Sequence, residues 1–325
     1  MNNIKCMFFI FQGYDIKKKI YKGDVVMKKV LLAVNPTAGN EEAGDFKDRL
    51  IEKLNTYFET VDAQMTEYEG HIAELAHKAC EEKYDAFFVM GGDGTVSEAI
   101  SGLSEQDYKP IFGFIPMGTV NDLARALNMP LDPEICIENL VLDSPVKLDV
   151  GKVNDKYFSN MVAIGALPRS VKDTSIEDKS KFGKFAYVIN GIKELKESTP
   201  SRYKLNVDGR EFEIESSLIA ISVSGAMSSF GNFFKNISPD SKNLALLYTK
   251  DQSVFDMLLS LPEAIDGVDG ESERIGYQEF TNAKIELIGD GDNQTTIDGD
   301  EGPKLPLDIS ILAHHLDVFA SKEEE

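Results

Sequence analysis

The chain has 325 residues, of which 42% are hydrophobic and 27% charged, so it can bury a substantial core and suits two domains. Its formal net charge of -21 argues against binding to nucleic acid or to anionic lipid by bulk electrostatics. The three cysteines, Cys6, Cys80 and Cys136, are too scattered for a disulfide framework or a zinc site, which favours a reducing cytoplasm. No apolar stretch approaches the roughly 20 residues that span a bilayer.

Residues 1–26 stand apart from the rest of the chain. Their apolar run, Cys6–Phe11, is followed and not preceded by the basic cluster Lys17–Lys19, so it lacks the order of a secretory signal. Met27 directly precedes the first predicted strand and would be a natural start. We therefore expect residues 1–26 to be an over-extended reading frame, with an added membrane-touching arm as the alternative.

Strands and helices alternate from Lys28 to a helix expected near 133–140, a pattern typical of a parallel sheet. Three short apolar runs read as buried strands and each ends in a turn of small and polar residues. These strands are 29–34, 86–90 and 111–115, and their turns are 35–39, 91–95 and 116–122. Because ligands bind outside the carboxyl ends of the strands of an open parallel sheet, we expect the three turns to converge on one crevice.

The second turn reads Gly91-Gly92-Asp93-Gly94-Thr95 and precedes a helix expected over 96–103. Its glycines let a phosphate approach the backbone amides, and the positive end of the helix points at the same place. A carboxylate such as Asp93 beside a triphosphate is unfavourable unless a divalent cation or a protonated group lies between them. A metal nucleotide is therefore the simplest ligand, and a glycine-rich turn of an ordinary α/β protein is the alternative.

Beyond Pro145 the pattern changes to alternating apolar and polar residues, as in half-buried strands. The predicted strands are 147–153, 203–207, 211–214, 283–287 and a final strand at 316–319. The sequence thus predicts an α/β N-terminal domain with a parallel sheet, plus a mainly β, sandwich-like C-terminal domain. The nucleotide-binding domain would cover 27–145 and the β-rich domain 146–307, with segment 308–325 as a candidate to pack back on the first domain.

A second acidic cluster, Asp298-Gly299-Asp300-Glu301-Gly302, lies late in the chain. Its glycines let the backbone turn so that more than one carboxylate can face the same point. Phosphoryl transfer to an alcohol needs such a carboxylate to accept the hydroxyl proton. The alternative is an acidic hairpin turn, because Asp-Gly is a common turn pair.

The motifs Asn35–Gly39, Gly91–Thr95 and Gly118–Asp122, in this order, resemble the catalytic domain of the diacylglycerol kinase and sphingosine kinase superfamily. The closest resemblance is to the soluble bacterial diacylglycerol kinases and their lipid-kinase relatives. Nicotinamide dinucleotide kinases share the Gly-Gly-Asp-Gly-Thr motif, but the Asn-Pro and Gly-Thr-x-Asn-Asp turns favour the lipid kinases. The resemblance covers nearly the whole chain from Met27.

The resemblance implies an ATP-dependent lipid kinase that phosphorylates diacylglycerol to phosphatidic acid with Mg²⁺. The alternatives are a kinase for another lipid alcohol or a soluble nucleotide, and a nucleotide-binding regulatory protein without turnover. The family's general base is the third residue of a segment that usually reads Asp-Gly-Glu. That position is Asp300 here, one methylene shorter, with Asp298 as the supporting acid; Glu301 is left open as a substitute base.

The resemblance also assigns nucleotide contacts and a metal network. The nucleotide contacts are Asn35, Pro36, Thr37, Ala38, Gly39, Thr66, Gly91, Gly92, Asp93, Gly94, Thr95, Val96, Ser97, Gly118 and Thr119. For Thr66 an ordinary strand-end threonine is an equal alternative. Asp93 and Asp149 would belong to an aspartate, water and magnesium network, although for Asp149 a solvent-facing acid at a strand end is an equal alternative. The family's Asp-Asp-Gly is missing from 239–247, which puts its structural metal in doubt.

A lipid substrate would require the enzyme to be cytoplasmic and peripheral at the membrane, with transient surface contact. A basic stretch with interleaved aromatic residues near the predicted acceptor side suits this contact: Arg169, Lys172, Lys179, Lys181, Phe182, Lys184 and Phe185. A solvated helix face is at least as good an interpretation of that stretch. No nucleic-acid partner is expected, and a homodimer is left open.

Overall fold

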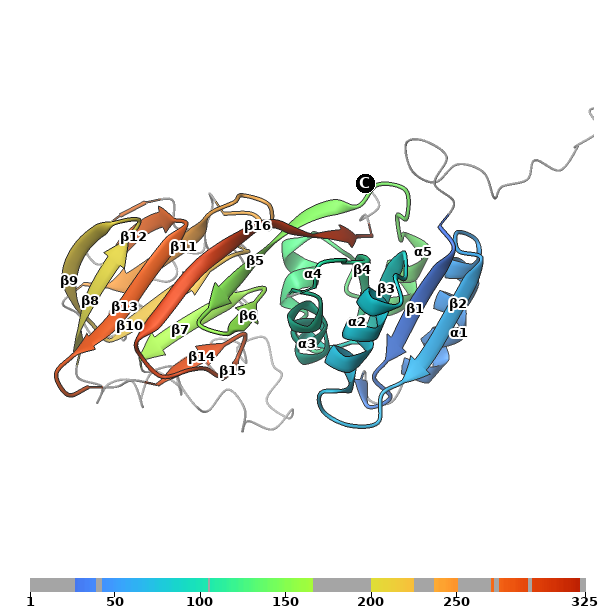
Figure 1. Cartoon of the computed structure of the whole chain (residues 1–325), viewed down its shortest axis with the longest axis horizontal. Helices are drawn as coiled ribbons and strands as arrows, with labels where there is room; N and C mark the ends of the chain where they lie inside the picture. Colours follow the sequence, from blue (N-terminus) through green and yellow to red (C-terminus); the bar gives the residue numbers. More distant parts are fainter. Residues whose placement is uncertain are drawn as a thin grey trace, which may run out of the picture.

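The computed structural model describes residues 27–38, 43–104, 106–165, 200–224, 237–250, 270–271, 275–291 and 294–321. Two halves lie side by side: an α/β half, and a half made of strands alone among the residues described (Figure 1). The helices are α1 (Ala43–Asn55), α2 (His71–Glu81), α3 (Asp93–Ser104), α4 (Asp122–Ala126) and α5 (Pro133–Glu138).

The strands of the α/β half form the parallel sheet that the sequence predicts. They are β1 (Lys29–Val34), β2 (Thr60–Met65), β3 (Ala86–Gly91) and β4 (Ile111–Pro116), in the order β2-β1-β3-β4. Every residue of β3 is buried, as are the last five of β1, because helices cover both faces of a parallel sheet. All four strands therefore end at one edge of the sheet.

A long strand extends from one half into the other. It is β16 (Leu307–Phe319), which runs between them in Figure 1 and pairs in parallel with β4, opposing Val318 to Phe112. Along most of its length it also pairs with the antiparallel strand β5 (Val146–Val153). Leu316, Val318 and Phe319 belong to the core of the α/β half, so the C-terminal part of the described chain packs on the first half.

The second half is an antiparallel β-sandwich, as expected. One layer continues the large sheet through β16, β13 (Asn282–Ile288), β8 (Ser201–Val207) and β9 (Arg210–Ser216), with β6 (Lys156–Phe158) beside β5. The other layer comprises β12 (Ile275–Phe280), β11 (Leu244–Thr249), β10 (Leu218–Ser222), β7 (Met161–Gly165), β14 (Thr295–Ile297) and β15 (Asp300–Glu301). Side chains such as Leu205, Ile285 and Ile219 form the core between the layers. The fold class is confirmed.

Candidate active site

The first two turns are joined at the carboxyl ends of β1 and β3. Asn35 Nδ2 donates to Thr95 Oγ1 at 3.2 Å, and the Asn35 backbone N–H donates to the Met90 carbonyl at 3.0 Å. Asn35 Oδ1 accepts hydrogen bonds from the N–H and hydroxyl of Thr37, at 3.1 and 2.9 Å. A side chain that bonds its own turn in this way fixes the loop that follows the strand. The first turn is therefore held against the second.

The second and third turns touch through backbone atoms. A Cβ added to Gly92 would lie 3.1 Å from the Cα of Gly118, so only glycines fit comfortably at this contact. Asn121, with φ 56°, closes the third turn by accepting from Gly118 N–H at 2.8 Å and donating to Gly118 O at 2.9 Å. The expected convergence of the three turns is confirmed.

Asp93 differs from its predicted setting. Helix α3 begins at Asp93 and not near Val96, so Asp93, Gly94 and Thr95 form its first turn. The Asp93 carboxylate accepts the backbone N–H groups of Asn121 at 2.9 Å and Asp122 at 2.6 Å, which begin α4. Backbone amides thus compensate this charge, and the carboxylate does not by itself require a cation.

The remaining predicted nucleotide contacts surround these turns. Thr66 follows β2 and donates its N–H to the Val34 carbonyl at 2.8 Å, which places it beside the first turn. Thr95 and Val96 are buried, whereas Thr119 and Gly94 are exposed. A Cβ on Gly94 would meet nothing within 4 Å, so the N-terminus of α3 is open at that point. Pro36, Thr37, Ala38 and Ser97 are exposed or half-buried, and Gly39 lies outside the described residues.

The acidic cluster 298–302 includes the turn of a hairpin between β14 and β15. It therefore has the geometry of the acidic hairpin turn that was the alternative to a catalytic role. Asp298 and Gly299 have φ 47° and 91°, the left-handed pair of a two-residue hairpin turn. The Asp298 carboxylate accepts N–H groups from Ser159 at 2.9 Å, Asn160 at 3.0 Å and Met161 at 2.8 Å. Burial raises the pKa of Asp298, and these hydrogen bonds oppose that rise. Asp298 thus anchors the hairpin, while Asp300 is exposed on it.

One residue that the sequence did not single out connects the hairpin to the turns. Asn160 donates its backbone N–H to Asp298, and its Nδ2 donates to Asp122 Oδ2 at 2.7 Å. Asp122 in turn donates its N–H to Asp93. Asp122 belongs to the Gly118–Asp122 motif, but a single asparagine before a strand carries no signal. The structure therefore links the converging turns to the acidic hairpin through Asn160.

Asp149 lies on β5 and is fully buried, so the alternative of a solvent-facing acid is wrong. Its carboxylate accepts Lys242 N–H at 2.5 Å and His314 N–H at 2.6 Å, and both donors have left-handed backbone, with φ 64° and 50°. His314 lies where the register of β16 against β5 shifts, so Asp149 holds a β-bulge. Its metal role stays a prediction.

The donor set agrees with a magnesium ion held largely by the nucleotide. No group of three or more metal-ligating side chains occurs among the residues that the structure describes. Magnesium usually keeps several waters and takes one or two carboxylates together with substrate phosphates. Each Asp93 oxygen retains a lone pair beyond its amide bond, so the Asp93 carboxylate fits as a protein ligand of such an ion.

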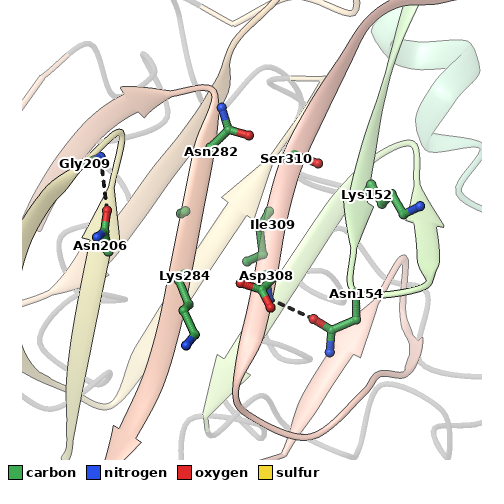
Figure 2. Close-up of a pocket in the computed structure, with 10 residues that line it drawn as sticks. Lys152, Asn154, Asn206, Gly209, Asn282, Lys284, Asp308, Ile309 and Ser310 are labelled. Atoms are coloured by element: carbon green, nitrogen blue, oxygen red, sulfur yellow. Dashed lines mark hydrogen bonds between the residues drawn. The ribbon is translucent and has the colours of Figure 1, made fainter.

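An open depression of about 430 Å³ lies elsewhere, on the large sheet (Figure 2). None of the predicted site residues lines it. Its polar side chains bond the neighbouring strand ends: Asn154 Oδ1 accepts Asp308 N–H at 2.8 Å, and Asn206 Oδ1 accepts Gly209 N–H at 3.1 Å. The candidate active site is therefore at the turns.

The backbone amides at the start of α3 are open to a phosphate, and a chain of hydrogen bonds connects this helix start to an acidic hairpin. This arrangement is expected of a phosphotransferase that uses a nucleotide. Two family models match the chain: the diacylglycerol kinase catalytic domain over 29–153, and the YegS C-terminal NAD kinase beta sandwich-like domain over 162–320. The chain belongs to the diacylglycerol kinase family of lipid kinases.

Relatives support this membership along most of the chain. A "Putative lipid kinase" of Streptococcus pneumoniae serotype 4 is 35% identical over 303 residues, which are 92% of this chain and 100% of that protein. A "Diacylglycerol kinase" of Staphylococcus aureus strain MRSA252 is 31% identical over 297 residues, 91% of this chain and 93% of that one. The fold is shared with the crystal structure of a "putative diacylglycerol kinase" from Bacillus anthracis, with a TM-score of 0.76 and 24% sequence identity. The match covers 92% of this chain and 99% of that one.

Proposed function

We propose that this lipid kinase transfers the γ-phosphate of ATP to the hydroxyl of diacylglycerol and releases phosphatidic acid and ADP. The observation that carries the proposal is the hydrogen-bonded path from Asp93 through Asp122 and Asn160 to Asp298. This path connects the turns that would bind the phosphates to the hairpin that carries Asp300. Phosphoryl transfer depends mainly on positioning and charge neutralisation, which such a path can supply.

The nucleotide phosphates would lie against the first turn of α3 and the loops after β1 and β4. Gly94 leaves the amides at the start of α3 open to an anion, and Thr37 and Thr119 present exposed hydroxyl-bearing side chains near that edge. Asp93 would hold the Mg²⁺ that neutralises the transferred charge. Its bonds to the amides of α4 fix the carboxylate before the nucleotide arrives.

Asp300 would act as the general base. As the lipid oxygen forms its bond to the γ-phosphorus, the bond from that phosphorus to the β,γ-bridging oxygen breaks and the hydroxyl proton passes to the Asp300 carboxylate. Asp298 supports the step by holding the hairpin through three backbone amides. Asp300 is exposed on the short strand β15, where a hydroxyl can approach it.

The lipid would be reached by transient contact at the membrane surface from the cytoplasmic side. Within the described part of the chain, no helix is long and apolar enough to cross a bilayer. The net charge of -21 means that any attraction to anionic lipid must be local. The basic stretch from Arg169 to Lys184 that we expect to make this contact lies outside the described residues. A homodimer is a further proposal.

The test is transfer of labelled γ-phosphate from ATP to a panel of lipids in mixed micelles, with and without Mg²⁺. Diacylglycerol, other lipid alcohols and a soluble dinucleotide form the panel. Label in phosphatidic acid that depends on Mg²⁺ is the expected result. Label in another lipid would change the acceptor, and label in the dinucleotide would overturn the lipid assignment.

The missing Asp-Asp-Gly at 239–247 favours one second candidate, a nucleotide-binding regulatory protein without turnover. Leu244 and Ala245 offer no side-chain ligand there and are fully buried in β11. Tight ATP binding together with no labelled product in any reaction would favour this candidate over the kinase.

A further inference from the structure

Asn160 has every polar group engaged and is 5% exposed. Its Nδ2 donates to Asp122, and its Oδ1 accepts the Ser224 hydroxyl at 3.1 Å. Its N–H donates to Asp298, and its carbonyl accepts Val223 N–H at 3.1 Å. One residue thus contacts the start of α4, the acidic hairpin and the segment after β10.

These contacts belong to different halves of the molecule. Asp122 begins α4 in the α/β half, whereas Asp298 and Ser224 lie in the β-sandwich. The two halves are also joined along β16 and β5, a pair that carries the bulge at His314, and by β6, whose Tyr157 packs in the core of the α/β half. A bulge bends its strand and locally interrupts the ladder of hydrogen bonds between the two strands. A side-chain bond close to the predicted chemistry is therefore well placed to fix how near the hairpin lies to the turns.

The amide suits this place because it both donates and accepts. A carboxylate of the same shape could not donate to Asp122, and its negative charge would lie beside Asp122 and Asp298, the two acids that contact residue 160. An alanine would remove the bond without adding a charge. The two replacements therefore separate hydrogen bonding from simple filling of space.

We propose that Asn160 is a positioning residue that sets the distance between the nucleotide phosphates and the Asp300 carboxylate. The catalytic part of this inference rests on the proposed function. Asn160 touches no reacting atom; it acts through Asp122 and Asp298. A displacement on the order of 1 Å between reacting groups can cost about 100-fold in rate. Loss of the Asn160 amide should consequently lower kcat while the phosphate-binding turns stay intact.

The first experiment compares Asn160→Ala and Asn160→Asp with the wild-type chain. Asn206→Ala is the matched control, because its amide bonds only a hairpin turn at Gly209 among the described contacts. We expect ATP affinity, measured by calorimetry, to stay within about threefold of wild type in all variants. We expect kcat to fall about 10- to 100-fold in Asn160→Ala and further in Asn160→Asp, with Asn206→Ala unchanged.

Two outcomes would overturn the proposal. If Asn160→Asp keeps wild-type kcat, the side chain only fills space, since aspartate has nearly the same shape. If ATP affinity falls in parallel with kcat, Asn160 has a general structural role and not a positioning one. If Asn160→Ala does not fold, the comparison of Asn160→Asp with the wild-type protein decides between these outcomes.

The second experiment measures the distance itself and needs no turnover. Spin labels would be placed at Asp48→Cys on α1 and Glu215→Cys on β9, both exposed, in a Cys6→Ser background. Double electron–electron resonance should give a narrow distance distribution for wild type and a broader or shifted one for Asn160→Ala. An unchanged distribution would overturn the positioning role. If no lipid is phosphorylated but the distribution still broadens, the proposed function fails and the role of Asn160 in fixing the two halves stands.

Discussion

Gly92 and Gly118 meet backbone to backbone where the second and third turns converge. A Cβ on Gly118 would lie 2.8 Å from the Cα of Gly92 and 2.7 Å from Asn121 Oδ1. We expect Gly118→Ala to destabilise the protein by roughly 1–3 kcal/mol, because the turns must separate to admit the methyl group. Thermal unfolding measures this loss. Gly44→Ala on α1 is the control, because an added Cβ meets no atom within 4 Å there and the midpoint should not fall.

Gly94→Ala tests the phosphate site separately from the fold. Its added methyl group meets no protein atom within 4 Å, so the thermal midpoint should not fall. The same methyl group would occupy the space beside the first amides of α3, where we propose that a phosphate lies. ATP affinity measured by calorimetry should therefore drop about tenfold or more. Unchanged affinity would place the phosphates elsewhere.

Asp300→Asn should preserve ATP binding and lower phosphoryl transfer by about 100- to 10,000-fold, because the amide cannot accept the hydroxyl proton. Labelled transfer under single-turnover conditions measures the step. Glu301→Gln is the matched control on the same strand and should retain most activity. If Glu301→Gln is the inactive variant, the neighbouring acid is the base and the hairpin presents the other side chain.

Asp149→Ala should destabilise the fold, because it leaves the N–H groups of Lys242 and His314 without their acceptor. A fully buried donor left unsatisfied costs about 1–3 kcal/mol; these two hydrogen bonds are partly buried, so each should cost no more than that, and urea unfolding reports the sum. Asp143→Ala, an exposed acid shortly before β5, is the control. Mg²⁺ should not change the loss if the role of Asp149 is to hold the bulge. If Mg²⁺ raises the stability of the wild-type protein but not that of Asp149→Ala, the result would instead support the predicted metal role.

The sequence predicted those strands and helices whose position depends on neighbouring residues alone. The apolar runs that became β1, β3 and β4 need burial on both faces, and this need is visible within six residues. The start of α3 was placed too late because Asp93, Gly94 and Thr95 have the composition of a turn as well as of a helix N-terminus. The last strand was expected only from Leu316, because the bulge at His314 interrupts the alternation that otherwise begins at Leu307.

Long-range partners could not be predicted in the same way. Asp149 bonds residues 93 and 165 positions away, and Asn160 bonds Asp298 at a separation of 138. Neither partnership leaves a periodic trace, since one polar side chain is sufficient and its partners are backbone N–H groups, which every residue except proline provides. The motifs therefore indicated the turns that we propose bind the phosphates, while the connection between those turns and the hairpin needed three-dimensional information.

The buried thiol of Cys136 should make stability fall at alkaline pH. Burial raises the pKa of Cys136 from 9.0 to about 11, and Ser321 lies 3.2 Å from its sulfur. Because the folded state disfavours the thiolate, the stabilisation is complete below pH 9, where the thiol is protonated in both states. It is lost as the pH rises from 9 towards 11, since only the unfolded chain then ionises. The loss is on the order of 2–3 kcal/mol.

Urea unfolding at pH 8 and pH 10.5 measures that loss, and Cys136→Ala is the matched comparison. Burial also raises the pKa values of Cys80 and Tyr84, so the informative quantity is the difference between the two proteins and not the slope of either one. Wild type should lose more stability than Cys136→Ala between the two pH values, because the alanine variant has no thiol to ionise when it unfolds. Equal losses would mean that the Cys136 thiol ionises as readily in the folded protein as in the unfolded chain, and that the contact between α5 and the C-terminal segment at Ser321 is open to water.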